Sequence, residues 1–498
     1  MKHAGDAVMK GMLVALLLGT CATTLAQEAT VRQHEPNTRV PKGVVRYTPS
    51  GFPDRIVASP AQDGSTGFSV AWRTDTRVSA PQLEIVVAGD SPDMGEPRRI
   101  TATSAPLKTE NGEAHHHRAD VDGLQPDTLY AWRVQGDRTW SAWHHTRTAA
   151  AASAPLTLLY FGDTQNKNVS LTTRVVREAI RAAPEARLAL FAGDLVSGGD
   201  GEDDNEWGEW FEANEVLPTS LVVAPAPGNH EYFEEFEDTP QERRVLGAHW
   251  PVTFALPGNG VTQARRTTYW FDYQDVRVVV IDGTSALDLG TAKAQAAWLD
   301  QALASNPHRW SIVLTHQPFF SPREGRDNVL LRQHLLPVIR KRKVDLVLQG
   351  HDHVYGRLKN EAPTPVFVVS VTGAKQYRLS DEARKTMRPV AEDTQLFQVV
   401  RELDGRVHFV HMGDAIERLN GLRVQEVLDD PGVLYRQILD EDMERLRTAE
   451  RNSFLSMTSL EAVFRVRRTD GQVRWMHLNS TPRQLDDGRV LWDGVQTD

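Results

Sequence analysis

Five apolar runs in the middle of the chain each end in residues that can bind a metal ion. An apolar run bounded by glycine or proline is typical of a buried strand. In an open α/β sheet, ligands gather where the carboxyl ends of the strands meet. We therefore expect the polar ends of these runs to form one site. The runs are 156–163, 188–194, 221–230, 311–316 and 345–353, and their polar ends are Asp163, Asp194, Asn229 with His230, His316, and His351 with His353.

Strand-like runs alternate with helical segments between about residues 155 and 412, which predicts a central α/β domain with sheets flanked by helices. Helices are expected over 171–182 and 292–303, and in the second of these Ala296, Leu299 and Leu303 form an apolar stripe at helical spacing. The runs 268–273 and 276–281 predict a hairpin. The segment 199–215, rich in acidic residues and tryptophan, is expected to be a loop, either at the rim of the site or solvated without a role.

Residues 50–148 contain short alternating runs separated by turns, a pattern typical of an all-β sandwich. Within them, the stretch 123–130 resembles the turn and tyrosine corner of fibronectin type III domains. The triplet His115–His117 could bind a metal ion, but we favour an edge strand whose imidazoles face a neighbouring domain. Residues 27–49 are polar and contain three prolines, so we expect a linker or an arm packed on the next domain.

The length and charge of the chain limit its class. A chain of 498 residues is too long for one ordinary core, so several domains are expected. Its apolar content of 40% and charged content of 24% are typical of a globular protein. The net charge is −10 and the chain has no basic run, so we expect no nucleic-acid partner. For the same reason the sequence offers no obvious basic patch that could bind anionic lipid. The oligomeric state does not follow from these data.

The first 26 residues have the pattern of a secretory signal peptide. Two lysines precede the apolar run 11–19, and small residues before Gln27 provide a cleavage site. The run is too short to span a bilayer, so we expect no stable membrane anchor and a periplasmic or secreted protein. The single cysteine, Cys21, lies in this segment, and a lipoprotein is the less favoured alternative. Cleavage after Ala26 would leave neither disulfides nor thiolate ligands.

Residues 420–498 are expected to form a small α+β appendage. The charged segment 440–446 predicts a helix, and the runs 462–467 and 473–478 on either side of a Thr-Asp-Gly turn predict a hairpin. This region resembles the second half of a PAS sensor domain, in residues 464–475, 487–490 and 494–498. The opening strands of that fold have no counterpart before Leu422, so we expect a partial PAS-like segment and not a complete sensor.

The central residues combine carboxylate, amide and imidazole groups, which suit hard to borderline cations. They are more numerous than one four-coordinate ion requires, so two ions that share a carboxylate fit better. Two metal ions about 3.5–4 Å apart form the arrangement used for displacement at phosphorus. The sequence therefore predicts two metal ions and a phosphorylated small-molecule substrate.

The ordered motifs Gly-Asp163, Gly-Asp194, Gly-Asn-His230-Glu, a strand-ending His316 and Gly-His-Asp-His353 resemble the calcineurin-like metallophosphoesterase superfamily. Together with the fibronectin-like front domain, residues 50–412 resemble the purple acid phosphatases.

The resemblance implies a role for each polar residue. It implies a bridging carboxylate from Asp194, and it implies that Asn229 and His230 contact phosphate while His230 protonates the leaving group. The remaining ligands that it implies are Asp163 and His353 for the first metal, and Asn229, His316 and His351 for the second.

The expected activity is that of a secreted phosphoesterase in which a hydroxide between two metals attacks a phosphomonoester. One alternative is a phosphodiesterase that acts on nucleotides or lipid headgroups. Another is a metal-dependent sensing or binding protein, suggested by the PAS-like segment. The presence of His230 favours an enzyme, because binding alone requires no general acid.

Three positions depart from the family pattern. Ser197 replaces the tyrosine that colours purple acid phosphatases, so we expect no purple ferric site. Gln165 stands where many members carry histidine, so the Gln165 amide or a water would complete the coordination of the first metal ion. The identity of this ion stays open between iron, zinc and manganese. No phosphate-binding histidine follows His316. Arg323 or Arg326 could bind phosphate in its place through bidentate hydrogen bonds, or could be exposed loop cations.

Overall fold

The structure is a computed structural model that describes residues 40, 44–91, 93–197, 202–236, 239–358, 365–402, 415–430, 432–484 and 490–497. The predicted signal peptide with Cys21, most of the arm 27–49 and the segment 403–412 lie outside these residues. No helix in the described ranges is long and apolar enough to cross a bilayer.

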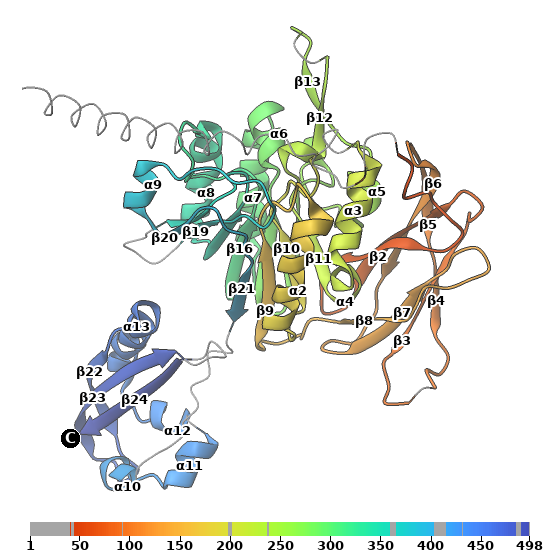
Figure 1. The fold of residues 1–498 in the computed structure, drawn as a ribbon. Coiled ribbons are helices and arrows are strands. Elements are labelled where there is room, and N and C mark those ends of the chain that lie inside the picture. Colours follow the sequence, from red (N-terminus) through yellow and green to blue (C-terminus); the bar gives the residue numbers. More distant parts are fainter. Residues whose placement is uncertain are drawn as a thin grey trace, which may run out of the picture. The chain divides into compact units, whose positions relative to one another are not determined.

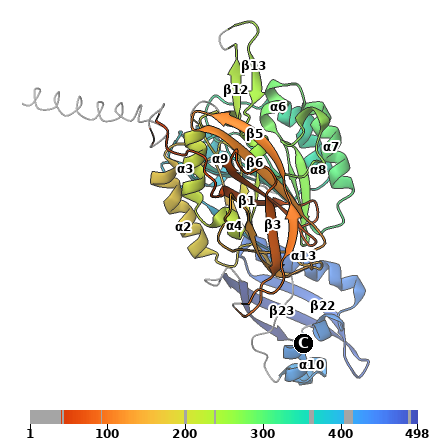
Figure 2. The ribbon, with the colours of Figure 1, turned by 90° about the vertical axis from the view of Figure 1, so that its right-hand side faces the viewer.

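Residues 54–147 form a sandwich of two four-stranded antiparallel sheets (Figure 2), which confirms the predicted all-β fold. The strand orders are β1-β2-β6-β5 and β4-β3-β7-β8. Phe68 of one sheet and Trp132 of the other meet with ring centroids 6.1 Å apart. The Tyr130 hydroxyl accepts a hydrogen bond from the Gln125 N–H at 2.8 Å, as expected of a tyrosine corner. The strands are β1 (Asp54–Pro60), β2 (Phe68–Asp75), β3 (Gln82–Val87), β4 (Arg98–Thr101), β5 (Thr103–Thr109), β6 (Gly112–Val121), β7 (Leu129–Val134) and β8 (His144–Arg147).

The histidine triplet lies on β6, which is an inner strand between β2 and β5 and not the expected edge strand. The edge-strand prediction was wrong because β5 pairs with residues Gly112 to Arg118 on the second side of β6, a stretch that includes the triplet. The His117 ring lies between the hydroxyls of Thr74 and Ser104, at 2.7 Å from each. The His115 ring contacts the Val78 carbonyl at 2.6 Å. The triplet is therefore part of the sandwich, and the metal-type clusters among the described residues do not include it.

The central part of the chain contains two sheets between two groups of helices, which confirms the predicted α/β arrangement (Figure 1). One sheet has the order β11-β10-β9-β21 and the other β14-β15-β16-β17-β19-β18-β20. The expected hairpin is the antiparallel pair β14 and β15. The strands are β9 (Leu156–Phe161), β10 (Leu188–Phe191), β11 (Val222–Pro225), β14 (Tyr269–Tyr273), β15 (Val276–Val280), β16 (Trp310–Leu314), β17 (Leu346–Gln349), β18 (Tyr355–Leu358), β19 (Val366–Val369), β20 (Met387–Ala391) and β21 (Gln398–Glu402).

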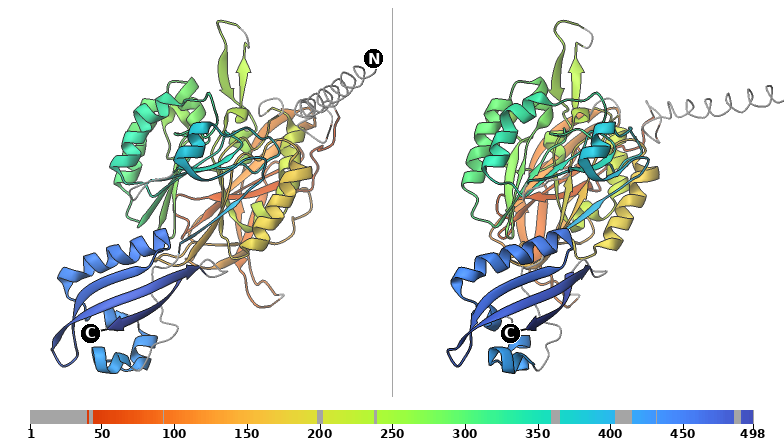
Figure 3. Two further views of the ribbon diagram at one scale, coloured as in Figure 1. Left: turned by 60° about the vertical axis from the view of Figure 1, so that its left-hand side comes forward. Right: turned by 90° about the vertical axis from the view of Figure 1, so that its left-hand side faces the viewer.

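The helices lie on opposite sides of these sheets. Figure 3 shows α7 and α8 on one side and α2 and α3 on the other. Strands β12 (Tyr232–Glu235) and β13 (Arg243–Leu246) form a hairpin that projects from this part of the molecule. The helices are α2 (Thr173–Ala182), α3 (Asp204–Asn214), α4 (Leu217–Ser220), α5 (Trp250–Thr253), α6 (Gly283–Asp288), α7 (Ala292–Ala304), α8 (Leu336–Lys341) and α9 (Asp381–Thr386), with short turns η1 (Asn168–Thr172), η3 (Asn229–Glu231), η4 (Thr262–Ala264) and η5 (Leu331–Leu335).

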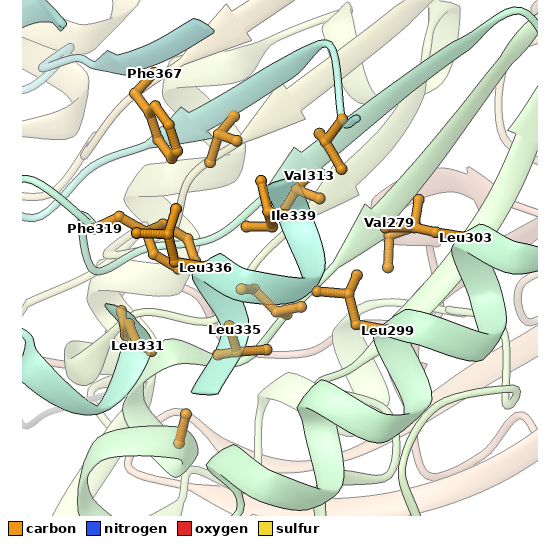
Figure 4. Packing of buried hydrophobic residues seen from close by; sticks show 14 of the residues in the cluster. Val279, Leu299, Leu303, Val313, Phe319, Leu331, Leu335, Leu336, Ile339 and Phe367 are labelled. Atoms are coloured by element: carbon orange, nitrogen blue, oxygen red, sulfur yellow. The ribbon is translucent and has the colours of Figure 1, made fainter. Parts of the chain in front are cut away.

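An apolar core fixes α7 and α8 on the larger sheet (Figure 4). Leu299 and Leu303 of α7 face Val279 of β15 and Val313 of β16 in one buried cluster. Burial of each such side chain contributes about 1.5–3 kcal/mol. The predicted apolar stripe of this helix is therefore what holds it on the sheet that carries His316.

The segment expected as a loop contains the helix α3, so this prediction was wrong for residues 204–214. The Asp203 side chain caps the helix by accepting hydrogen bonds from the N–H groups of Asn205 and Glu206. Trp207 and Trp210 are buried. The acidic residues suited a loop by composition, but at the start of a helix they are favoured by capping and by the helix dipole.

The residues from 415 onward fall in the second of two compact units. A three-stranded antiparallel sheet packs with α13 around Phe464, Val466 and Met476. The predicted helix and hairpin are therefore present. The elements are α10 (Ala415–Asn420), α11 (Val424–Asp429), α12 (Gly432–Tyr435), α13 (Asp440–Ser456), β22 (Leu460–Arg467), β23 (Val473–Gln484) and β24 (Val490–Thr497).

Candidate metal centre

The fold brings the polar ends of the five apolar runs together. Each lies a few residues beyond a strand, namely β9, β10, β11, β16 or β17. Asp163 joins the two sheets at this edge through an isolated parallel bridge to Val371. Asp194, His351 and His353 have positive φ angles of 49°, 72° and 47°. A non-glycine residue in this region is strained, and such strain clusters at functional sites.

The first of two clusters consists of Asp163, Asp194 and His353. The His353 Nε2 lies 3.3 Å from Asp163 Oδ2, while its Nδ1 contacts the Lys375 carbonyl at 3.1 Å. The carbonyl requires the proton on Nδ1, which leaves the Nε2 lone pair directed at the carboxylates. Gln165 Nε2 lies 2.8 Å from Asp194 Oδ2 and 3.2 Å from His353 Nε2.

The second cluster consists of Asp194, His316 and His351. The His316 Nε2 lies 3.1 Å from Asp194 Oδ2, 2.9 Å from the His351 Nδ1 and 3.2 Å from the Asn229 Oδ1. The other His316 nitrogen contacts the Ala192 carbonyl at 2.7 Å, which turns Nε2 toward the cluster. Asp194 is thus common to both clusters. The six residues predicted as ligands therefore meet around a single shared carboxylate.

The donor atoms of both clusters fit metal ions. In each cluster the nitrogen and oxygen atoms lie within 4.8 Å of one another. Asp163 Oδ2 and Gln165 Oε1 are buried and have no hydrogen-bond partner among the described residues. A buried carboxylate oxygen without a partner is costly unless a cation or a proton neutralises it. The assignment of amide oxygen and nitrogen follows from the hydrogen bonds, and turning the Gln165 amide would direct its oxygen at the first cluster.

The buried carboxylates of this site stabilise a positive charge beside them, which is visible in the pKa values of the neighbouring groups. Burial opposes the charged form of His316, but Asp194 and Asp163 outweigh burial and raise its pKa to about 9. Burial, together with Asp194, raises the pKa of Asp163 to about 7. Burial would also raise the pKa of Asp194, yet His316 and His230 hold it well below its usual value. The two carboxylates therefore favour a positive charge at this place.

Two glycines allow the loops to approach each other. A Cβ on Gly228 would lie 2.1 Å from Asp194 Oδ1, and one on Gly350 would lie 2.3 Å from Asp163 Oδ1. These distances are far below van der Waals contact. The glycine that precedes Asn229 and the one that precedes His351 are therefore required by the closeness of the carboxylates.

Glu231, the fourth residue of the Gly-Asn-His-Glu motif, is a functional residue that was not predicted from the sequence. Its buried carboxylate accepts hydrogen bonds from the N–H groups of Asp194, Leu195 and Gly228, at 3.0, 2.8 and 2.6 Å. Burial and the neighbouring Asp194 raise its pKa to about 7. Glu231 thus ties the Asp194 loop to the loop that carries Asn229. Its position inside the motif was the only sequence signal for this role.

Glu231→Gln is expected to lower metal affinity by about 10- to 100-fold, the usual effect of losing a group that orients metal ligands. The amide places an N–H₂ group against backbone donors and cannot accept all three hydrogen bonds. Calorimetric titration with Zn²⁺ or Mn²⁺ measures the affinity, and circular dichroism checks the fold. Glu234→Gln, which alters an ion pair to Arg244 on the adjacent strand, is the matched control. Unchanged metal affinity in Glu231→Gln would contradict this role.

The other predicted contacts have distinct environments. Arg326 donates to the buried carboxylate of Asp352 at 2.9 Å and to the His351 carbonyl at 3.2 Å, so its guanidinium braces the loop between the two histidines. The Arg323 guanidinium lies instead over the Tyr377 ring, 3.8 Å from its centre. The Ser197 hydroxyl accepts a hydrogen bond from Asn166 Nδ2 at 3.1 Å.

Comparisons with known proteins agree with this geometry. Residues 156–355 match the calcineurin-like phosphoesterase family, residues 53–148 the N-terminal domain of purple acid phosphatases, and residues 409–496 the PAS fold. The central domain therefore has the fold and the motifs of a calcineurin-like phosphoesterase domain. More particularly, the domain that precedes it matches the N-terminal domain of purple acid phosphatases, and the chain is similar to these proteins.

Individual relatives are distant. An uncharacterized protein of Mycobacterium tuberculosis is 28% identical over 346 residues, which cover 61% of this chain and 63% of that protein. The phosphoenolpyruvate phosphatase of Allium cepa is 24% identical over 315 residues, covering 61% and 62%. The chain thus spans less than two thirds of these relatives. The structure of purple acid phosphatase PPD1 from yellow lupin seeds has a TM-score of 0.57 at 17% identity, covering 70% of each chain, and shows the same fold.

Proposed function

We propose that this protein is an exported phosphatase that hydrolyses phosphomonoesters with two metal ions. The observation that carries the proposal is the membership of Asp194 in both clusters, since a shared carboxylate lets two ions act on one phosphoryl group. The pattern of residues 1–26 supports export to the periplasm or the exterior. The names of relatives, a phosphoenolpyruvate phosphatase and several purple acid phosphatases, support a monoester substrate.

In this proposal each ion has its own ligands besides Asp194. Two ions bound there would supply charge neutralisation and an activated water for attack at phosphorus. Iron, zinc and manganese all suit the oxygen and imidazole donors. The ligands are Asp163, His353 and the Gln165 amide for the first ion, and Asn229, His316 and His351 for the second.

His230 is the proposed general acid. Its backbone N–H donates to Asp194 Oδ1 at 3.0 Å, which fixes the residue beside the shared carboxylate. Its side chain is half-buried and so remains accessible to a substrate. Protonation of the leaving oxygen by such a group contributes about 10²–10⁴-fold in rate. Asn229 Oδ1 faces the second cluster, while its Nδ2 would be available to a phosphate oxygen.

The test is hydrolysis by the mature chain, 27–498, after removal of metal and reconstitution with iron, zinc or manganese. We expect 4-nitrophenyl phosphate to be turned over at least about tenfold faster than bis(4-nitrophenyl) phosphate, because a monoester leaves all three terminal oxygens free for the ions and their neighbours. Activity should disappear on chelation and return with metal. A preference for the diester would establish the phosphodiesterase alternative, and metal binding without turnover of either ester would favour the sensing alternative.

A further inference from the structure

An aromatic ring next to the first cluster organises two cations. The loop after β19 is tied to the site through Gly373, whose N–H donates to the Asp163 carbonyl at 2.6 Å. Further along this loop, the Tyr377 ring packs edge-on against the His353 ring, with centroids 5.0 Å apart. Tyr377 is therefore in direct contact with a residue of the first cluster.

Arg323 and Lys375 lie against this ring. The Arg323 guanidinium carbon is 3.8 Å from the centre of the Tyr377 ring, and the Lys375 ammonium is 5.5 Å from it. An arginine stacked on an aromatic face is held in place while its N–H donors point outward along the guanidinium edge. All three side chains are half-buried and so are open to solvent on one side.

Neither cation has an ion-pair partner among the residues that the structure describes, unlike their neighbours. Arg378 and Arg384, from the same part of the fold, pair with Asp393 and Glu392, each at 2.7 Å. Arg326, in the same loop as Arg323, forms an ion pair with Asp352 at 2.9 Å. Among the described residues, Arg323 and Lys375 are thus two cations near the first cluster that form no ion pair.

Both cations are linked to the first cluster through direct contacts. The Lys375 carbonyl lies 3.1 Å from the His353 Nδ1. The Tyr377 ring, against which Arg323 and Lys375 lie, packs on the His353 ring. A substrate held on the first cluster would therefore lie next to the ring that organises the two cations.

We propose that Arg323 and Lys375, organised by Tyr377, bind a second anionic group of the substrate, a carboxylate or a further phosphate carried on its alcohol moiety. The inference rests on the proposed phosphatase function. Planar recognition of a carboxylate or phosphate is the chemistry for which a stacked guanidinium is suited. An anion here would give both cations an anionic partner.

The test compares substrates that differ only in charge. The metal-loaded chain is given 3- and 4-carboxyphenyl phosphate and their carbamoyl isosteres, which match them in size but are neutral. A second arm compares 1,4-phenylene bisphosphate, corrected for its two ester groups, with 4-hydroxyphenyl phosphate. We expect kcat/KM to favour the anionic member in at least one arm by about tenfold or more, as expected for a charge-assisted contact. The arm that shows the preference identifies carboxylate or phosphate.

Variants assign the preference to the two cations. Arg323→Met and Lys375→Gln are expected to reduce the anionic-to-neutral ratio at least about fivefold. Arg323→Lys should recover it only in part, because it restores the charge but not the planar guanidinium. Arg378→Gln and Arg384→Gln remove cations that already have partners, and should leave the ratio unchanged. Calorimetric binding of 4-carboxyphenyl phosphonate and its carbamoyl analogue should show the same loss of discrimination without turnover.

The outcomes separate this inference from the proposed function. Equal kcat/KM for charged and neutral esters, with phenyl phosphate still hydrolysed, overturns the second anion site and leaves the phosphatase proposal standing. A preference that persists in Arg323→Met and Lys375→Gln also overturns it. No turnover of any monoester overturns the phosphatase proposal and this inference together.

Discussion

Asp194→Asn is expected to lower kcat/KM for 4-nitrophenyl phosphate by at least about 10³-fold. Removal of a single group that stabilises the transition state typically costs about 10²–10³-fold, and here one change affects both proposed ions. Asp194 Oδ2 lies 3.1 Å from His316 Nε2 and 2.8 Å from Gln165 Nε2, so its charge is central to both clusters. Metal analysis should show that the variant holds fewer than two ions per chain.

Asp300→Asn is the matched control for this change. It alters a surface carboxylate that pairs with Arg342 and Lys341 away from the site, and should keep both the metal content and kcat/KM within about twofold. Full activity of Asp194→Asn with two bound ions would refute the two-metal assignment. Loss of activity with unchanged metal content would instead place Asp194 in the chemistry rather than in metal binding.

Asp204→Asn is expected to lower the free energy of unfolding by about 3–5 kcal/mol, the usual cost of removing one partner from a buried charge network. The carboxylate of Asp204, at the start of α3, accepts hydrogen bonds from Arg55 at 2.5 and 2.9 Å and from Arg73 at 3.3 Å. It also contacts His249 at 3.0 Å and Asn111 at 2.9 Å. Asparagine would leave the buried Arg55 guanidinium without an ion-pair partner among the described residues, and would leave Arg73 paired with Asp54 alone.

The destabilisation should depend on pH. Burial would raise the pKa of Asp204, but His249, Arg55 and Arg73 hold it far below its usual value. Its contribution is therefore present above the unfolded-state pKa of about 3.9 and is lost as pH falls toward the lower native value. The difference between wild type and Asp204→Asn should be full at pH 7 and shrink below about pH 4.

Urea denaturation followed by tryptophan fluorescence measures this effect, because Trp207 and Trp210 are buried on the same helix. Glu212→Gln is the control. Glu212 on α3 contacts the Tyr47 hydroxyl at 2.8 Å and Arg46 at 3.5 Å at the surface, and its replacement should cost no more than about 1 kcal/mol. Equal stability of Asp204→Asn and Glu212→Gln would contradict the buried network.

The strands and their polar ends could be predicted because both signals are local. An apolar run specifies a buried strand, and the residue after it must lie at the end of that strand. Where strands such as β16 and β17 are parallel neighbours, their ends meet at one edge, so His316 and His351 could be expected together. The shared position of Asp194 was implied only by the resemblance to the metallophosphoesterases, because the strand-end pattern does not distinguish Asp194 from Asp163.

The errors concern residues whose surroundings come from distant parts of the chain. Composition placed residues 204–214 in a loop, but Arg55 and Arg73 of the sandwich bind Asp204 and favour a buried helix. The histidine triplet was assigned to an edge strand because the pairing of β5 along β6 is not visible in the triplet itself. The role of Glu231 depends on N–H groups of a different loop.

The sequence by itself determined which residues meet at the metal centre, since each stands at the end of its own apolar strand. Only the tertiary structure decided what their neighbours do. Arg323 and Arg326 lie three residues apart in one loop, yet Arg326 is bound to Asp352 and Arg323 stacks on Tyr377 with no carboxylate partner among the described residues. The ion-pair partner of a charged side chain depends on which distant segment of the chain packs against it. The fold therefore determines this partner, and the local sequence does not.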